Sequence, residues 1–357
     1  MEKFVTVVIV IALFIIGGLA IFGGSGGSGN TITLGLILSL TGDATSYGES
    51  ELKAIQVAVE EINAEGGVIG KKLALVTKER QCDQEAAGTA AEKLVASAYI
   101  IIGGACSEET LAAAEVTNSL RAFFISPSAS SPKVSEAGNF VFRTYPSETI
   151  AAKIAARYAS EKLGVEKAAL ATELTDYAQS LREVFKTRFT EFGGTVVADE
   201  TFQTGGTDFR AQILKIKNAK PDGVYVVPQT VAPGVAFLKQ LREAKVTVKI
   251  ITAEVLLDRK AVAENAAILE GVMGVESAID WENNSKAKAF REAHEQKFGS
   301  EPGSFAANAY DATYLIRDAI AATKSTDTEK IRDWFYGVKD WEGAAGKITI
   351  DGNGEPV

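Results

Sequence analysis

Short apolar segments alternate with helix-like segments along nearly the whole chain, and this alternation restricts the fold more than any other feature. The first set of strands is predicted at residues 32–40, 73–79, 99–104, 122–126 and 139–144, with helices between them at 49–64, 84–97 and 108–119. In the helix at 49–64, Ile55, Val59 and Ile62 recur on one face. Strands separated by helices pair in parallel, so this half predicts a mostly parallel sheet covered by helices on both faces.

The same pattern starts again near residue 148. It predicts helices at 148–163, 176–191, 207–218, 234–244 and 258–269, with strands at 167–172, 195–202, 223–228 and 248–253. The remainder predicts a strand at 272–279, helices at 285–298, 304–323 and 327–337, and a strand near 347–350. Because 357 residues are more than a domain with a single hydrophobic core usually contains, we predict an α/β protein of two doubly wound, Rossmann-like lobes. Such proteins bind ligands in a crevice outside the carboxyl ends of the strands.

The first thirty residues precede this pattern. Residues 4–22 carry no charge, and as a helix they would rise about 28 Å, close to the thickness of a bilayer's hydrocarbon core. Lys3 lies before this segment and the next charged residue is Asp43, an asymmetry that favours export of the remainder. We therefore expect residues 1–23 to anchor the protein in a membrane, with a cleaved signal peptide as the alternative, and residues 24–30 to be a flexible Gly/Ser linker. The remainder would then lie outside the cytoplasm.

The charge and the reactive residues exclude several functions. A net charge of −9 without a Lys/Arg-rich run argues against nucleic-acid binding. Two Cys and one His are too few ligands for a metal site built from cysteine and histidine. His294 falls in a charged helical segment and is interpreted as solvated, and Glu60–Glu61 and Glu108–Glu109 as solvated or helix-terminal carboxylates. Because no nucleophile elbow, Walker loop or dinucleotide-binding loop follows a strand, we predict no enzyme and no cofactor.

Two cysteines, Cys82 and Cys106, lie at the ends of predicted strands. In an oxidising compartment such a pair is more often bridged than free, and two unpaired core thiols are the alternative. A bridge would close a loop of roughly 25 residues and stabilise the fold by about 3 kcal/mol.

Small hydroxyl residues follow two adjacent predicted strands. The strand at 99–104 breaks at Gly103 and Gly104 and delivers Ser107 to the start of a helix, and the apolar run at 122–125 ends in the Ser-rich stretch 126–132. Helix N-termini present unpaired N–H donors and a positive dipole end, which stabilise an anion. No glycine-rich phosphate loop accompanies these serines, so we expect them to hold the carboxylate of a small molecule.

Several short motifs occur in an order and spacing that resemble those of a known family. From Thr31 almost to the C-terminus, the chain resembles the type I periplasmic solute-binding proteins of ABC transporters, and most of all their leucine/isoleucine/valine-binding branch. The matching segments are 35–42 with Tyr47-Gly48, 58–67 with Gly70-Lys71, Cys82-Asp83, 103–107, 126–130, 207–209 and 305–312.

The resemblance implies the fold and the partners. It implies two lobes joined by three hinge strands, the first lobe comprising 31–145 plus 276–344 and the second 146–275 plus 345–357. The lobes would close on an amino acid, which the receptor would deliver to a membrane permease. We further expect a monomer, held at the membrane through its N-terminal segment.

The resemblance also implies a set of ligand-binding residues. Hydroxyl and backbone N–H groups would hold the α-carboxylate, Glu254 would pair with the α-ammonium, and Tyr47 and Tyr177 would pack on the ligand from opposite lobes. The family disulfide matches Cys82–Cys106. The residues that match the carboxylate site are Ser107, Ser128, Ala129 and Ser130.

Two positions depart from the pattern of the family. Gln229 stands after the strand at 223–228, where branched-chain receptors carry an aromatic residue, and Ala105 replaces a larger aliphatic residue. A smaller wall and an amide favour a ligand other than plain leucine, such as a polar or larger amino acid. A receptor for amides or urea, or the ligand-sensing domain of a signalling complex, are the alternative functions.

Overall fold

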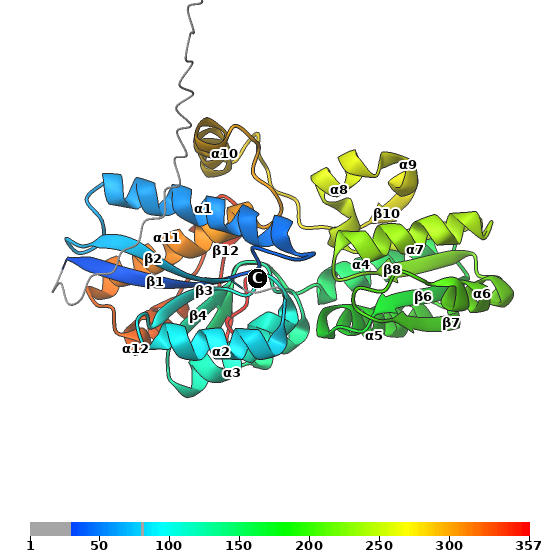
Figure 1. Ribbon diagram of the computed structural model, residues 1–357, viewed down its shortest axis with the longest axis horizontal. Helices are drawn as coiled ribbons and strands as arrows, with labels where there is room; N and C mark the ends of the chain where they lie inside the picture. Colours follow the sequence, from blue (N-terminus) through cyan, green and yellow to red (C-terminus); the bar gives the residue numbers. More distant parts are fainter. Residues whose placement is uncertain (1–29, 80–81) are drawn as a thin grey trace, which may run out of the picture.

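The computed structural model describes residues 30–79 and 82–357, which form two α/β lobes side by side along the long axis of the molecule (Figure 1). The prediction of two parallel-sheet lobes is confirmed, because each lobe contains one five-stranded parallel sheet with helices on both faces. The predicted anchor or signal segment at 1–23 and the linker at 24–29 lie outside the described residues. Within the described part of the chain, no helix is long and apolar enough to cross a membrane.

The first lobe is built on a sheet in the order β2-β1-β3-β4-β5. Alternate residues of a strand point to opposite faces, so Leu34 and Leu36 enter one core and Ile37 enters the other. The strands are β1 (Thr31–Leu38), β2 (Lys72–Glu79), β3 (Ile100–Gly103), β4 (Phe123–Ser126) and β5 (Val141–Arg143).

Helices cover both faces of this sheet, with α1 and α10 above it and α2 and α3 below it in Figure 1. The first group is α1 (Thr45–Ala64), α10 (Ser285–Phe298), α11 (Ala306–Thr323) and α12 (Thr328–Phe335), and the second is α2 (Gln84–Val95) and α3 (Ser107–Ser119). The lobe also contains the short helix η1 (Pro132–Glu136) and the hairpin of β11 (Trp341–Glu342) and β12 (Lys347–Ile348).

The second lobe repeats this design with strands in the order β10-β9-β8-β6-β7. Its strands are β6 (Lys167–Glu173), β7 (Thr195–Phe202), β8 (Gly223–Val227), β9 (Lys249–Thr252) and β10 (Val272–Gly274). Helices α4 (Thr149–Glu161) and α5 (Asp176–Glu191) cover one face. The other face carries α6 (Arg210–Ala219), α7 (Val231–Glu243), η2 (Glu254–Leu257), α8 (Arg259–Glu264) and α9 (Ala266–Leu269).

The end of the chain packs differently from the prediction. Residues 345–357 were expected in the second lobe, but Ile348 and Ile350 are buried in the core of the first. The Arg143 N–H donates to the Gly354 carbonyl at 3.1 Å, which holds the last residues beside β5. Within residues 30–79 and 82–357, the chain therefore crosses between the lobes twice, after β5 and after β10, and the predicted third hinge strand is not formed.

Helix α1 begins earlier than predicted. The turn at 42–45 is closed by the Thr45 N–H, which donates to the Gly42 carbonyl at 3.2 Å, and the helix starts at Thr45 instead of residue 49. Tyr47, predicted to lie in a loop, is consequently in the first turn of α1, at the end of the helix that faces the second lobe (Figure 1).

Candidate functional site

The two serine-bearing strand ends lie side by side in the structure. β3 and β4 are adjacent parallel strands, with Ile102 opposite Ile125, so both carboxyl ends reach the same edge of the sheet. Gly103 and Gly104 allow β3 to turn sharply into α3, because both have positive φ angles. A Cβ atom on Gly103 would lie 2.0 Å from the Ile37 carbonyl oxygen, so this turn requires glycine.

Hydrogen bonds lock these two strand ends together. The Ser126 hydroxyl donates to the Gly104 carbonyl at 3.0 Å and accepts from the Ala129 N–H at 3.0 Å. The Ser128 hydroxyl donates to the same carbonyl at 3.2 Å. The Ser107 hydroxyl accepts from the Ser131 N–H at 3.1 Å, joining the start of α3 to the serine loop.

The predicted carboxylate residues are therefore brought together on lobe one. Ser107, Ser128, Ala129 and Ser130 are all buried. The Ala129 N–H already bonds to Ser126, so Ala129 offers a ligand no free donor. We call the group of Ser107, Ser128 and Ser130 the serine cradle.

Arg143 supports the serine cradle from behind. Its guanidinium donates to the carbonyl of Ala129 at 3.2 Å and to that of Ser131 at 3.0 Å. It also donates to the Ser135 hydroxyl at 2.8 Å and forms an ion pair with Glu355 near the end of the chain. One buried side chain thus fixes the loop on both sides of Ser130.

The predicted disulfide is present between Cys82 and Cys106, whose Cα atoms lie 5.5 Å apart. Cys106 immediately precedes Ser107, so the bridge fixes the start of α3. Glu109 was interpreted as solvated or helix-terminal. It lies in the first turn of α3 but is buried, and it accepts from the Ser39 hydroxyl at 3.2 Å and from the Ala105 N–H at 3.0 Å. This carboxylate therefore holds the turn that leads into Cys106.

Acidic and aromatic residues form the opposite side of the site. Glu254 opens η2, and burial is the main cause that raises its pKa to about 7. Glu148 lies beside it, and its carboxylate accepts from the Tyr145 hydroxyl at 3.0 Å. Burial and the nearby Glu254 raise the pKa of Glu148. The Tyr177 hydroxyl, at the start of α5, lies close enough to Glu254 to lower the pKa of that carboxyl.

Several polar atoms in this region have no hydrogen bond of good geometry within the described part of the chain. They are the hydroxyls of Tyr47 and Tyr177, one oxygen of Glu148 and of Glu254, the amide oxygen of Gln229, and both oxygens of Glu51. Buried polar groups are normally paired, because leaving one unpaired costs about 1–3 kcal/mol. These buried atoms around the cleft are therefore able to form hydrogen bonds with a polar ligand.

Glu51 is a site residue that sequence reasoning missed. It lies one helical turn after Tyr47 on α1, is fully buried, and its pKa is raised to about 8, mainly by burial and partly offset by the nearby Ser128 hydroxyl. A signal was present, because a glutamate four residues after Tyr47 falls on the face of α1 that carries Ala54 and Ile55.

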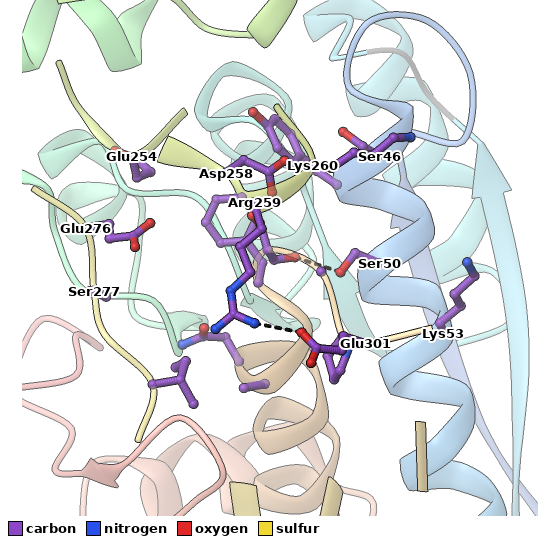
Figure 2. Close-up of a pocket in the computed structure, with 18 of the residues that line it drawn as sticks. Ser46, Ser50, Lys53, Glu254, Asp258, Arg259, Lys260, Glu276, Ser277 and Glu301 are labelled. Atoms are coloured by element: carbon purple, nitrogen blue, oxygen red, sulfur yellow. Dashed lines mark hydrogen bonds and ion pairs between the residues drawn. The ribbon is translucent and has the colours of Figure 1, made fainter. Parts of the chain in front are cut away.

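A cavity of about 630 Å³ opens beside this cleft, between α1, η2 and the crossing segment after β10 (Figure 2). Tyr47, Tyr145, Glu254 and Phe305 contribute to its wall, so it adjoins the site. Figure 2 shows Arg259 reaching across it to Glu301, with which it pairs at 2.8 Å. Phe305 packs edge-on against Tyr47, with ring centroids 5.4 Å apart.

His294 also lines this cavity, and the interpretation of it as solvated was wrong. Its side chain is only 1% exposed, and Nδ1 lies 2.8 Å from the Ser300 carbonyl oxygen. Burial lowers the pKa of His294 below its ordinary value. The charged neighbours in the sequence point to solvent, while His294 lies on the face of α10 that also carries Ala287 and Phe290.

The two departures from the family pattern lie close to the cleft. Ala105 is buried beside Tyr47 and Cys106 in a small apolar cluster. Gln229 follows β8, and its N–H donates to the Glu173 carboxylate at 2.7 Å. Glu148 and Glu173 were also missed, because their importance depends on which lobe faces they occupy and not on a local motif.

Comparison with known proteins agrees with this geometry. The model of a family described as periplasmic binding protein matches residues 31–357. The chain belongs to this family. Its members are substrate-binding receptors rather than enzymes, and membership implies a location outside the cytoplasm. The resemblance to the leucine/isoleucine/valine-binding branch is thereby confirmed.

Individual relatives cover most of the chain. A leucine-, isoleucine-, valine-, threonine- and alanine-binding protein of Pseudomonas aeruginosa is 25% identical over 91% of this chain and 87% of its own. The branched-chain amino acid binding protein LivJ of Streptococcus pneumoniae, solved with isoleucine, is 29% identical and has a TM-score of 0.83. The match covers 92% of this chain and 94% of LivJ. A solute-binding protein of Rhodopseudomonas palustris, solved with 3,4-dihydroxybenzoic acid, is 25% identical and has a TM-score of 0.79. The match covers 90% of this chain and 89% of that protein.

Proposed function

We propose that this chain is a receptor that binds a free amino acid in the cleft between its lobes and delivers it to an ABC-transporter permease. An amino acid carries a carboxylate and an ammonium group on one carbon atom, so its site needs donors on one side and acceptors on the other. The Ser107 hydroxyl of the serine cradle accepts from the Ser131 N–H and can donate its own proton to a carboxylate, and Glu148 and Glu254 supply acceptors. Family membership supports the transport role.

The buried carboxyl of Glu254 is the observation that carries this proposal. Its side chain is 8% exposed, and its Oε2 atom has no hydrogen bond of good geometry in residues 30–79 and 82–357, although Tyr177 and Glu148 lie close to the carboxyl. A second acid, Glu148, lies beside it, so the ligand-free site contains two neighbouring carboxyls that repel each other when ionised. An ammonium group would pair with both and remove this cost.

The same carboxyls disfavour other ligands. An aromatic acid such as the one bound by the Rhodopseudomonas relative brings a carboxylate but no cation, so Glu254 would stay unpaired next to another anion. Urea and simple amides bring hydrogen-bond donors but no charge to balance Glu254. A zwitterion satisfies both sides of the cleft, and we therefore favour an amino acid.

Calorimetry and thermal shift with the purified chain test the proposal. We expect at least one of the twenty amino acids to raise the melting temperature, and benzoate and urea to have no effect. Ser107→Ala and Glu254→Gln should each weaken binding about tenfold or more, because hydrogen bonds to a charged group contribute about 1.5–3 kcal/mol.

Matched exposed residues provide the controls. Ser119→Ala at the other end of α3 and Glu264→Gln on α8 should leave the affinity unchanged, since both side chains lie away from the cleft. If no amino acid stabilises the protein, the proposed function is wrong. If amino acids bind but neither site variant weakens them, the site is wrong.

A further inference from the structure

A second cavity, of about 450 Å³, lies between the lobes and is lined by residues of both. Its charged residues are Asp43, Glu108 and Glu173, and none of the described residues that line it is Lys, Arg or His. The 630 Å³ cavity differs, because its wall contains basic residues, among them Lys53 and Arg259, as well as acidic ones.

Two buried acceptor atoms in its wall have no partner among the described residues. Glu173 is fully buried, and one of its carboxylate oxygens accepts the Gln229 N–H at 2.7 Å while the other, Oε1, has no hydrogen bond. Gln229 is 9% exposed, and its amide oxygen is also unpaired. Both atoms are hydrogen-bond acceptors, so a ligand group that pairs with them must be a hydrogen-bond donor.

This cavity adjoins the proposed amino-acid site. Ala44 and Cys82 in its wall pack in one cluster with Tyr47, Ala105 and Cys106. Glu108 in its wall directly follows Ser107 of the serine cradle. The cavity therefore lies close to Ser107, where the side chain of a ligand bound through its carboxylate could reach it.

We propose that the cavity of Glu173 and Gln229 binds a positively charged side-chain group, so that the preferred ligand is a dibasic amino acid such as lysine, ornithine or arginine. This inference rests on the proposed function and specifies its ligand. The Glu173 carboxylate pairs with the terminal ammonium or guanidinium group, and the Gln229 amide oxygen accepts a second hydrogen bond from it.

The physical reason is the cost of the unpaired groups. An aliphatic side chain would cover Glu173 and Gln229 without pairing them, and an unpaired buried acceptor destabilises the complex. A cation pairs with both, and it also balances the like charges of Asp43 and Glu108, which contribute to the raised pKa of Glu173 after burial itself. Discrimination then comes as much from rejecting leucine as from binding lysine.

Isosteric ligands provide the test. Norleucine has a methyl group where ornithine has its terminal ammonium group, and 2-aminoheptanoic acid stands in the same relation to lysine. By calorimetry with the full chain at pH 7, we expect lysine or ornithine to bind at least tenfold more tightly than its apolar counterpart. Glu173→Gln should lower the affinity for the dibasic ligand at least tenfold and leave that for norleucine unchanged or higher, because the glutamine oxygen still accepts the Gln229 N–H.

The outcomes separate the two proposals. Glu191→Gln, on the exposed end of α5, is the matched control and should change neither affinity. If norleucine binds as tightly as ornithine, or if Glu173→Gln affects both equally, the dibasic assignment is overturned while the amino-acid receptor stands. If neutral glutamine binds more tightly than lysine, the assignment of charge is overturned. If no amino acid binds, the proposed function itself fails.

Discussion

Single buried carboxyls set the chemistry of this cleft. Glu51 on α1 and Glu254 on η2 belong to different lobes, yet both are buried and both have a pKa raised mainly by burial. At neutral pH Glu51 therefore favours its protonated form and Glu254 is close to half protonated, and a cation beside either carboxyl would favour the ionised form. Stability and binding should therefore both depend on pH in the range between about 4.5 and 8.

Glu51 gives a prediction with a definite sign. Its pKa rises from 4.5 in the unfolded chain to about 8 in the fold, so the folded protein binds the additional proton and loses stability as the pH rises through this range. The loss approaches about 1.4 kcal/mol per pH unit. We expect Glu51→Gln to flatten this slope and to be more stable than the parent chain at pH 8, as measured by urea denaturation from pH 5 to 8.5.

A neighbour on the same helix is the control. Glu49 is exposed on α1, so Glu49→Gln should leave the slope unchanged. Part of the dependence of stability on pH will remain in Glu51→Gln, because the fold also raises the pKa of Glu254. An undiminished slope in Glu51→Gln would show that Glu51 is ionised in the fold.

At the scale of elements, the last segment of the chain supports the serine cradle. Arg143, at the end of β5, connects Glu355 in this segment to the carbonyls of Ala129 and Ser131. Arg143→Lys removes the planar fork that makes these contacts. We expect a loss of about 3 kcal/mol in the free energy of unfolding and a weaker affinity for the amino acid, measured by urea denaturation and calorimetry.

An exposed arginine gives the comparison for this change. Arg157 pairs with Glu161 on the surface of α4, with both side chains largely exposed, and Arg157→Lys should cost less than about 1 kcal/mol. Equal effects of the two substitutions would contradict a supporting role for Arg143. If Arg143→Lys is less stable but binds the amino acid as tightly as the parent chain, Arg143 contributes to stability and not to binding.

The elements themselves could be predicted better than the residues that complete the site. The apolar runs gave the strands of both sheets, and the adjacency of β3 and β4 followed from their order. The packing of residues 345–357 on lobe one could not be predicted, since it depends on Ile348 and Ile350 finding a core formed by distant helices. Glu148 and Glu173 were missed for a similar reason, because burial of a carboxyl by residues from separate elements leaves no periodic signal in the sequence.

On the scale of the whole molecule, the two lobes touch through a few polar contacts. Lys133 of η1 pairs with Asp176 of α5, and the Glu108 carboxylate accepts the Asp176 N–H. The Ser131 and Ser180 hydroxyls lie 3.3 Å apart. The Ser304 hydroxyl donates to Asp258 at 2.5 Å on the other side of the cleft. These contacts are lost when the lobes separate, so they favour the closed arrangement.

Lys133→Ala should shift the lobes toward the open arrangement without touching the ligand. The pair is partly exposed, so its contribution is about 0.5 kcal/mol, and the affinity for the amino acid should fall about two- to threefold. Small-angle scattering should show a larger radius of gyration for the ligand-free variant and the parent value at saturation with ligand. Lys215→Ala, which breaks a pair within lobe two, should change neither quantity. An unchanged affinity in Lys133→Ala would mean that this pair does not bias closure.

The two crossings between the lobes have a mechanical consequence. A rigid body tied to another at two points can turn only about the line that joins those points. The segments after β5 and after β10 are such ties, so a swing about the line that joins them is the lobe movement that disturbs them least. The crossing after β10 also forms a wall of the 630 Å³ cavity, so this line runs beside the cavity. A swing of the lobes about it would therefore change the width of that cavity.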